Sequence, residues 1–248
     1  MSNVMPGAEP FFHEGGSVGC LLLHGFTSTP QEMHPLGQFL KECGFTVRGV
    51  LLAGHGTRVE ELHATHWRDW YHSAYEGWQA LQSSCARVFV IGQSLGGALA
   101  LHLAAHVPLA GVVALSTPLV TDARLLWLAR ILKFVWPYRK KGLSNIHDPA
   151  ALAARVAYRY TPNRSNEQVV LFLRHLNEDL PEVHIPALLM HSRHDQTVDP
   201  ATMPRIFERL GAQDKQMIWL ENSGHVVTVD YDRQLVCAAI ERFIVGHV

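Results

Sequence analysis

The feature that most constrains this chain is the segment Gly92-Gln93-Ser94-Leu95-Gly96, which lies between an apolar run and a helical pattern. The pattern G-x-S-x-G between a strand and a helix is typical of a sharp turn that exposes a serine hydroxyl. Such a turn strains the backbone at Ser94, and glycine at both flanking positions removes side chains that would clash. Ser94 then lies at the N-terminus of a helix, where the helix dipole favours a developing negative charge.

Short apolar runs alternate with longer helical patterns along the rest of the chain. The runs that predict strands are 18–23, 45–50, 87–91, 111–115, 185–190 and 216–220. The patterns that predict helices are 31–43, 67–82, 95–106, 201–210 and 231–245. Continuously apolar strands that alternate with helices predict an α/β fold, with a mostly parallel central sheet flanked by helices on both faces.

This alternation stops between the strand 111–115 and the strand 185–190. The intervening segment is mostly helical in pattern, and a structureless loop of that length inside a compact domain would be unusual. We therefore predict a helical cap subdomain at 117–181, inserted into a core formed by residues 1–116 and 182–248.

The first part of the insertion is strongly apolar and contains Leu125, Leu126 and Leu128, which are candidates for lining an acyl pocket. Arginine and lysine residues are interspersed among the apolar ones. The pattern fits a helix packed on the core with a solvated basic edge. It also fits an apolar cap over a site that contacts lipid aggregates, and the two interpretations are compatible.

A serine hydroxyl is a weak nucleophile, so it needs a base, and the base needs an acid that orients it. With this type of turn, the acid and then the histidine follow the serine along the chain. Asp195 follows the run 185–190, and His225 follows the run 216–220. Both positions lie past the carboxyl ends of strands, where sites form in parallel sheets. The sequence therefore predicts a catalytic triad of Ser94, His225 and Asp195.

Other residues compete for two of these roles. Asp199 is the alternative acid, but it precedes Pro200 at the start of a helix, which is the pattern of an N-cap. His191 and His194 are the alternative bases. They share a short loop with Asp195, which leaves little room to span both the acid and the serine.

Nucleophilic attack on a carbonyl also needs two N–H donors for the developing oxyanion. One donor is the backbone amide of Leu95, directly after the nucleophile. The other is expected from the loop after the first strand of the parallel sheet, where Phe26 is the candidate.

These residues resemble the α/β-hydrolase superfamily and, within it, the small bacterial carboxylesterases and monoacylglycerol lipases. The resemblance covers nearly the whole chain. It implies a capped acyl pocket, no cofactor, and hydrolysis of short- to medium-chain esters or monoacylglycerols through an acyl-enzyme. It rests on residues 24–27 and 54–56, the turn at Ser94, the Asp195 and His225 loops and the insertion before Asp195.

The fold alone does not determine the reaction. A thioester or C–C bond hydrolase could use the same triad. From a different class, the chain could be a ligand-binding receptor with a vestigial hydrolase site, although the complete triad and both oxyanion donors argue against that.

Charge and motif content argue against several other functions. The chain has 21 Lys and Arg residues against 22 Asp and Glu residues, so it lacks the basic excess of a nucleic-acid-binding domain. The four cysteines form no C-x-x-C pair, so no cysteine metal or redox motif is predicted. His102 and His106 have helical spacing, but no H-E-x-x-H motif or carboxylate ligand accompanies them, so no metal site is predicted.

The location follows from what the sequence lacks. Residues 1–10 contain neither the basic nor the apolar region of a secretory signal. No apolar run reaches the roughly 18 residues that a membrane-spanning helix needs. The expected location is the cytoplasm, and the expected partner is a small ester or lipid substrate.

Overall fold

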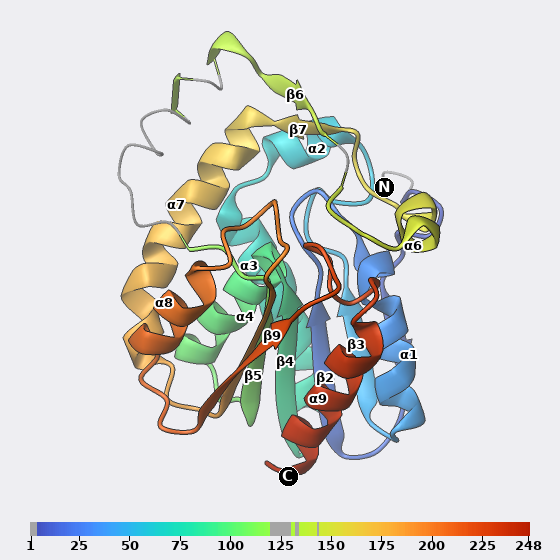
Figure 1. The fold of residues 1–248 in the computed structure, drawn as a ribbon, viewed down its shortest axis with the longest axis vertical. Coiled ribbons are helices and arrows are strands. Elements are labelled where there is room, and N and C mark those ends of the chain that lie inside the picture. Colours follow the sequence, from blue (N-terminus) through green and yellow to red (C-terminus); the bar gives the residue numbers. More distant parts are fainter. Residues whose placement is uncertain (1–3, 120–129, 132–133, 143) are drawn as a thin grey trace.

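The structure is a computed structural model that describes residues 4–119, 130–131, 134–142 and 144–248 (Figure 1). Its main strands are β1 (Phe11–His13), β2 (Val18–Leu23), β3 (Thr46–Val50), β4 (Arg87–Gln93), β5 (Gly111–Leu115), β8 (Ala187–Ser192) and β9 (Lys215–Leu220). They form one sheet in the order β1-β3-β2-β4-β5-β8-β9. All neighbours are parallel except β1, which pairs antiparallel with β3. The predicted α/β class and mostly parallel sheet are confirmed.

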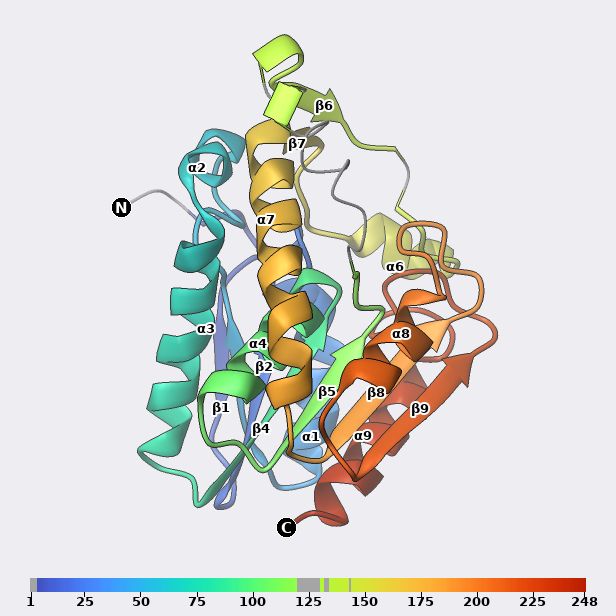
Figure 2. The same cartoon turned by 90° about the vertical axis from the view of Figure 1, so that its left-hand side faces the viewer.

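Helices cover both faces of this sheet (Figures 1 and 2). The α-helices are α1 (His34–Glu42), α2 (Val59–Ala64), α3 (Trp67–Gln82), α4 (Leu95–His106), α6 (Pro149–Ala154), α7 (Asn163–Asp179), α8 (Thr202–Arg209) and α9 (Arg233–Val245). The described residues also form two 3₁₀ helices, η1 (Pro30–Met33) and η2 (Leu180–Glu182). Helices α1 and α9 bury their apolar residues in the core on one face, whereas α3, α4, α7 and α8 share the core on the other face.

The central strands alternate between these two cores. Leu21 of β2 and Val90 of β4 lie in the core shared with α4. Leu22 and Ile91 lie in the opposite core, with α1 and α9. Successive side chains of a strand point to opposite faces, so a strand buried on both faces is apolar at every position. This burial explains the continuous apolar runs of the sequence.

Helix α4 is the most deeply placed helix of the fold, since residues 95–104 are all buried. It begins directly after β4, in the middle of the sheet. The first residues of α4 therefore lie at the edge of the sheet where the strands have their carboxyl ends. Its bounds and those of α3 are the predicted ones. The sequence did not predict β1, because a three-residue edge strand is too short to show a periodic pattern.

Two boundaries near the predicted site differ from expectation. Strand β8 begins after Pro186, because proline lacks the N–H that a ladder inside the sheet requires. The strand ends at Ser192, two residues later than predicted. His191 therefore lies on the strand and not in the loop with Asp195. The last helix begins at Arg233, two residues later than predicted.

The segment between β5 and β8 carries α6, α7 and a two-stranded antiparallel sheet of β6 (Tyr138–Lys140) and β7 (Tyr160–Pro162). We expected a mostly helical insertion, so these strands are an addition to the prediction. Helix α7 packs on the core through Phe172, which stacks on Trp67 with ring centroids 5.4 Å apart. Figure 2 shows α7 in front of α4, with β6 and β7 beyond its upper end. The candidate acyl-pocket leucines, Leu125, Leu126 and Leu128, lie outside the described residues.

None of the helices in the described part of the chain has the length and apolar character needed to span a membrane.

Candidate active site

Ser94 occupies a strained turn between β4 and α4, with φ 56° and ψ −116°. A Cβ at Gly92 would lie 2.0 Å from the carbonyl oxygen of Gly96, and a Cβ at Gly96 would lie 2.1 Å from that of Leu23. Both distances are far below van der Waals contact, so glycine is required at both positions. The predicted strain and the predicted role of the flanking glycines are confirmed.

Asp195 is buried just after β8 and accepts four N–H groups. Its Oδ1 accepts the amides of Thr197 (2.8 Å) and Val198 (2.9 Å). Its Oδ2 lies 2.7 Å from His225 Nδ1 and 2.9 Å from His191 Nε2. Burial alone would raise the pKa of Asp195, but the hydrogen bonds from the two imidazoles and the Val198 amide outweigh burial and hold it well below its usual value. Asp195 is therefore an ionised acid directed at His225.

The alternative acid has a different environment. Asp199 is exposed, and its Oδ1 accepts the amide of Ala201 at 2.9 Å. This contact closes the turn that leads into α8. The expectation that Asp199 is the N-cap is wrong, because α8 begins at Thr202 and its N-cap is Ala201, with no side-chain cap hydrogen bond.

The two alternative bases, His194 and His191, lie in different environments. His194 is exposed. His191 is buried on β8, and not in the expected loop, and its Nε2 lies 2.9 Å from Asp195 Oδ2. It is on the strand, and its Nδ1 has no hydrogen-bond partner. His191 is therefore a second donor to the acid, and it does not line the cavity above Ser94.

His225 is held by its backbone on both sides. Its amide donates to the carbonyl oxygen of Asn145 at 2.7 Å, and its own carbonyl accepts Gln93 Nε2 at 2.8 Å. Gln93 precedes Ser94, and Asn145 comes from the insertion. Neither residue carried a chemical signal in the sequence, because both contacts join segments that are far apart along the chain.

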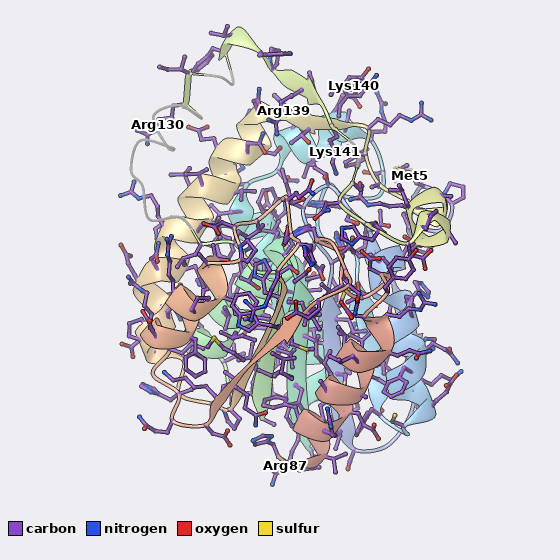
Figure 3. All side chains as sticks on the ribbon, in the orientation of Figure 1. Met5, Arg87, Arg130, Arg139, Lys140 and Lys141 are labelled. Carbon is purple, nitrogen blue, oxygen red and sulfur yellow. The ribbon has the colours of Figure 1, made fainter. Side chains whose placement is uncertain are left out.

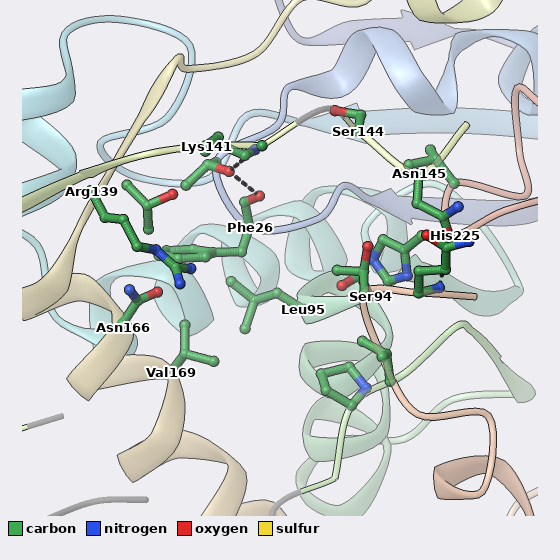
Figure 4. Close-up of a pocket in the computed structure, with 18 of the residues that line it drawn as sticks. Phe26, Ser94, Leu95, Arg139, Lys141, Ser144, Asn145, Asn166, Val169 and His225 are labelled. Carbon is green, nitrogen blue, oxygen red and sulfur yellow. Dashed lines mark hydrogen bonds between the residues drawn. The ribbon is translucent and has the colours of Figure 1, made fainter. Parts of the chain in front are cut away.

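Ser94, His225, Leu95 and Phe26 line one cavity of about 540 Å³. Figure 4 shows Ser94 and His225 at one end of it and Arg139 at the opposite end. The Ser94 hydroxyl makes no hydrogen bond to His225 or to another described residue. Catalytic hydrogen bonds are often long in unliganded enzymes and shorten when substrate binds.

The two expected oxyanion donors lie on this cavity. Leu95 is the first residue of α4, so its amide has no acceptor within the helix. Phe26 lies in the turn after β2, followed by Thr27 in a left-handed conformation with φ 59°. Neither amide donates a hydrogen bond to a described residue, so both are free to bind a ligand oxygen.

A buried carboxylate holds the Phe26 loop in place. Glu32 Oε1 accepts the amide of Gly25 at 2.6 Å, and its Oε2 accepts the hydroxyl of Ser28. His24 supports the same loop, because its Nε2 accepts the amide of Leu52 at 3.1 Å while Nδ1 lies 2.9 Å from the carbonyl of Gly25. Burial lowers the pKa of His24, in keeping with a neutral ring in which Nδ1 carries the proton.

The described insertion contributes mainly polar and cationic side chains to the cavity. They include Arg139, Lys141, Ser144, Asn145, Arg155, Thr161 and Asn166, whereas Pro118 and Val169 are apolar. The sequence prediction concerned the apolar stretch at 125–128 and missed these residues. They become neighbours only when the insertion folds back over the carboxyl edge of the sheet.

The pair His102 and His106 also needs a correction, because a carboxylate does accompany it. Asp179, at the end of α7, lies 2.6 Å from His102 Nδ1 and 3.3 Å from His106 Nε2. Asp179 is hydrogen-bonded to His102 and within ion-pair distance of His106, so the three side chains link α4 to α7. Spacing along one helix could not reveal a partner 77 residues away.

Comparisons with known proteins find a family and relatives that match nearly the whole chain. The model of the family described as serine aminopeptidase, S33, matches residues 18–232. A thermostable monoacylglycerol lipase of Bacillus sp. (strain H-257) is 34% identical, over 98% of this chain and 97% of its own length. A carboxylesterase of Bacillus subtilis (strain 168) is 29% identical, over 95% of this chain and 96% of its own length.

The fold has a close counterpart among solved structures. A structure from work on LipS and LipT, two metagenome-derived lipolytic enzymes, superposes with a TM-score of 0.93. The two sequences are 32% identical, and the match covers 99% of this chain and 100% of the other.

Proposed function

The chain belongs to the serine aminopeptidase S33 family of α/β-hydrolases and is a serine ester hydrolase, and we propose that Ser94, His225 and Asp195 are its catalytic triad. The observation that carries this proposal is the convergence of three loops. The 2.7 Å contact between Asp195 and His225 lies beside a cavity that also contains the strained Ser94.

In the proposed reaction, Ser94 attacks the ester carbonyl while His225 Nε2 takes the serine proton. Asp195 keeps the His225 proton on Nδ1 and stabilises the imidazolium. The amides of Phe26 and Leu95 donate to the oxyanion. His225 then protonates the departing alcohol, and a water molecule that His225 deprotonates releases the acid from the acyl-enzyme.

The proposed substrates are short- to medium-chain carboxylic esters, including monoacylglycerols. A cavity of about 540 Å³ is within the usual range for sites that bind small molecules. Leu95, Val169 and Val198 offer apolar surface to an acyl chain. The names of the two Bacillus relatives support the same substrate class.

We propose that residues 117–181 act as the cap of this site, on a core of 1–116 and 182–248. The support is that Asn145, from the insertion, contacts both catalytic loops. Its backbone carbonyl accepts the amide of His225, and its Oδ1 accepts the amide of Gln196 at 2.9 Å. The roles of Leu125, Leu126 and Leu128 in an acyl pocket stay a prediction.

The cap also offers a surface suited to lipid aggregates. Phe134, Val135 and Trp136 are 81%, 77% and 59% exposed, just before β6. Arg139 and Lys140 are exposed on β6 itself, at the outer end of the molecule (Figure 3). Exposed apolar side chains beside cations are typical of segments that bind at a lipid surface. We propose that this tip contacts the lipid phase when the substrate is aggregated.

The test of the tip compares the wild type with the triple change of Phe134, Val135 and Trp136 to serine. The variant should lose activity on monoacylglycerol above its aggregation threshold and keep activity on a soluble butyrate ester. Equal losses on both substrates would contradict lipid contact.

A cytoplasmic location stays a prediction. Its support is that Cys20, Cys43, Cys85 and Cys237 are all unpaired, as is usual where thiols are kept reduced.

The test of the proposed function is the release of p-nitrophenol from esters of increasing acyl length. An enzyme that forms an acyl-enzyme should release a burst of alcohol, whereas a binding receptor should release none. Matched thioesters in the same series distinguish an esterase from a thioesterase. A serine-directed phosphonate that labels any serine except Ser94 would contradict the assignment of the nucleophile.

A further inference from the structure

The cavity above Ser94 carries an excess of positive charge. Arg139, Lys141 and Arg155 line it, and none of the described residues in its wall is acidic. Figure 4 shows Arg139 and Lys141 on the cap side, facing the loop of Phe26. A site for neutral esters alone has no need of three cations, so these side chains require an explanation.

Two of the three cations lie partly buried with few partners. Lys141 Nζ donates to the Thr27 hydroxyl at 2.5 Å, a neutral acceptor. Burial and the nearby Arg155 lower the pKa of Lys141 to about 7, against the opposing attraction of Glu32. The hydrogen bond to Thr27 and the attraction of Glu32 therefore offset only part of the free-energy cost of removing the ammonium from water.

The hydrogen-bond donors of Arg155 have even fewer acceptors. Its guanidinium has five N–H donors, and its one hydrogen bond to a described residue is from Nη1 to the hydroxyl of Ser144. Its Nε is buried with no hydrogen-bond partner. A buried donor without an acceptor is unfavourable, and an anionic oxygen in the cavity would remove that penalty.

The protein supplies little negative charge to balance this pair. Glu32 is the acid that acts electrostatically on both Lys141 and Arg155. Its two carboxylate oxygens already accept the amide of Gly25 and the hydroxyl of Ser28. Neither cation forms an ion pair with an acidic residue in the described ranges. One carboxylate thus faces two cations, and Arg139 adds a third.

A purely structural role explains only part of this arrangement. Lys141 does anchor the cap to the core through Thr27, and Arg155 does contact Ser144. Neutral donors could make both contacts without the cost of burying charge. The spare donors and the open cavity beside them indicate a ligand.

We propose that the cavity selects esters that carry an anionic oxygen group, a carboxylate or a phosphate, which Lys141 and Arg155 bind while Ser94 attacks the ester carbonyl. This inference rests on the proposed function and narrows its substrate class. Arginine suits such a group because its planar fork can donate two parallel hydrogen bonds to one carboxylate or phosphate.

The experiment compares two p-nitrophenyl esters of equal carbon number, the monoester of glutaric acid and the pentanoate. The measured quantity is the ratio of kcat/KM for the anionic ester to kcat/KM for the neutral one. Arg155→Gln and Lys141→Gln should each lower this ratio by about tenfold to a hundredfold, the usual effect of one charge-assisted hydrogen bond. Arg174→Gln is the matched control, because Arg174 is an exposed cation on α7 that does not line the cavity.

Inhibition of pentanoate hydrolysis gives a second measurement that needs no variant to fold. Glutarate and inorganic phosphate are added separately to the wild-type protein. Inhibition by glutarate alone supports a carboxylate ligand, and inhibition by phosphate alone supports a phosphate ligand. If neither anion inhibits and the wild type does not prefer the glutarate ester, the inference is overturned. If no ester is hydrolysed at all, the proposed function itself fails, so the two failures are distinguishable.

Discussion

The change Asp195→Asn tests the centre of the proposed mechanism. Asparagine keeps an oxygen for the amides of Thr197 and Val198, which lie 2.8 and 2.9 Å from Oδ1. It places an NH₂ group where Oδ2 now faces His225 and His191, at 2.7 and 2.9 Å. Both imidazoles would have to accept a hydrogen bond there, so His225 would carry its proton on Nε2, the nitrogen that must deprotonate Ser94.

The wrong tautomer disables the base without disturbing the backbone. We expect kcat to fall on the order of 10⁴-fold, as in other triads whose acid is changed to the amide. We expect the free energy of unfolding to fall by about 1 to 2 kcal/mol, since two charge-assisted hydrogen bonds become neutral ones. The assays are p-nitrophenyl butyrate hydrolysis and urea unfolding.

The same variant makes a pH prediction whose sign follows from the lowered pKa of Asp195. A depressed folded-state pKa contributes stability that is fully present above the unfolded value, about 3.9, and is lost as pH falls toward the folded value. The stability difference between wild type and Asp195→Asn should therefore be constant above about pH 5 and shrink below about pH 4. A difference that grows in acid would contradict an ionised Asp195.

The control for this experiment is Asp199→Asn. Asp199 is exposed and bonds only to the turn before α8, through Oδ1 and the amide of Ala201. Asparagine preserves that acceptor, so activity and stability should stay near the wild-type values. Asp199→Ala removes that one hydrogen bond and should cost about 1 kcal/mol of stability and little activity. If an Asp199 variant loses activity while Asp195→Asn keeps more than a tenth of it, the acid has been assigned incorrectly.

Three further predictions test the nucleophile, the second imidazole and the cap. Ser94→Ala should lower kcat on the order of 10⁴-fold or more, and a phosphonate that labels the wild type once should not label the variant. His191→Phe removes one of the two imidazole donors to Asp195, so stability should fall by about 2 kcal/mol while kcat falls far less than in Asp195→Asn; equal losses of kcat would make His191 part of the proton-transfer machinery. Replacing Leu125, Leu126 and Leu128 by serine should flatten the rise of kcat/KM with acyl length, which otherwise gains about 0.8 kcal/mol per buried methylene. Equal losses for acetate and octanoate esters would show that this stretch supports the fold and does not select the substrate.

The sequence was most informative where local geometry alone decides the conformation. The strand-turn-helix around Ser94 could be predicted because only glycine tolerates the close approach at positions 92 and 96. The order of apolar runs was enough to predict a parallel sheet. It also placed Asp195 and His225 past the ends of strands, at the edge where Ser94 lies.

Short elements and strand ends were harder to predict. The edge strand β1 and the pair β6 and β7 have three residues each, too few for a period of two to be recognised. The extension of β8 to Ser192 depends on pairing with β9. That pairing moved His191 from a supposed loop onto a strand, where its ring reaches the acid.

The sequence by itself therefore determined the class of the fold, and it was enough to predict the proposed nucleophile and the two loops that carry its proposed partners. Only the tertiary structure decided what surrounds them: the second imidazole on Asp195, the Glu32 anchor and the cationic wall of the cavity. The contact of Lys141 with Thr27 spans 114 positions, and that of Gln93 with His225 spans 132. No local pattern records such pairs, because they form only when the insertion and the sheet loops pack together and must satisfy each other's buried polar groups.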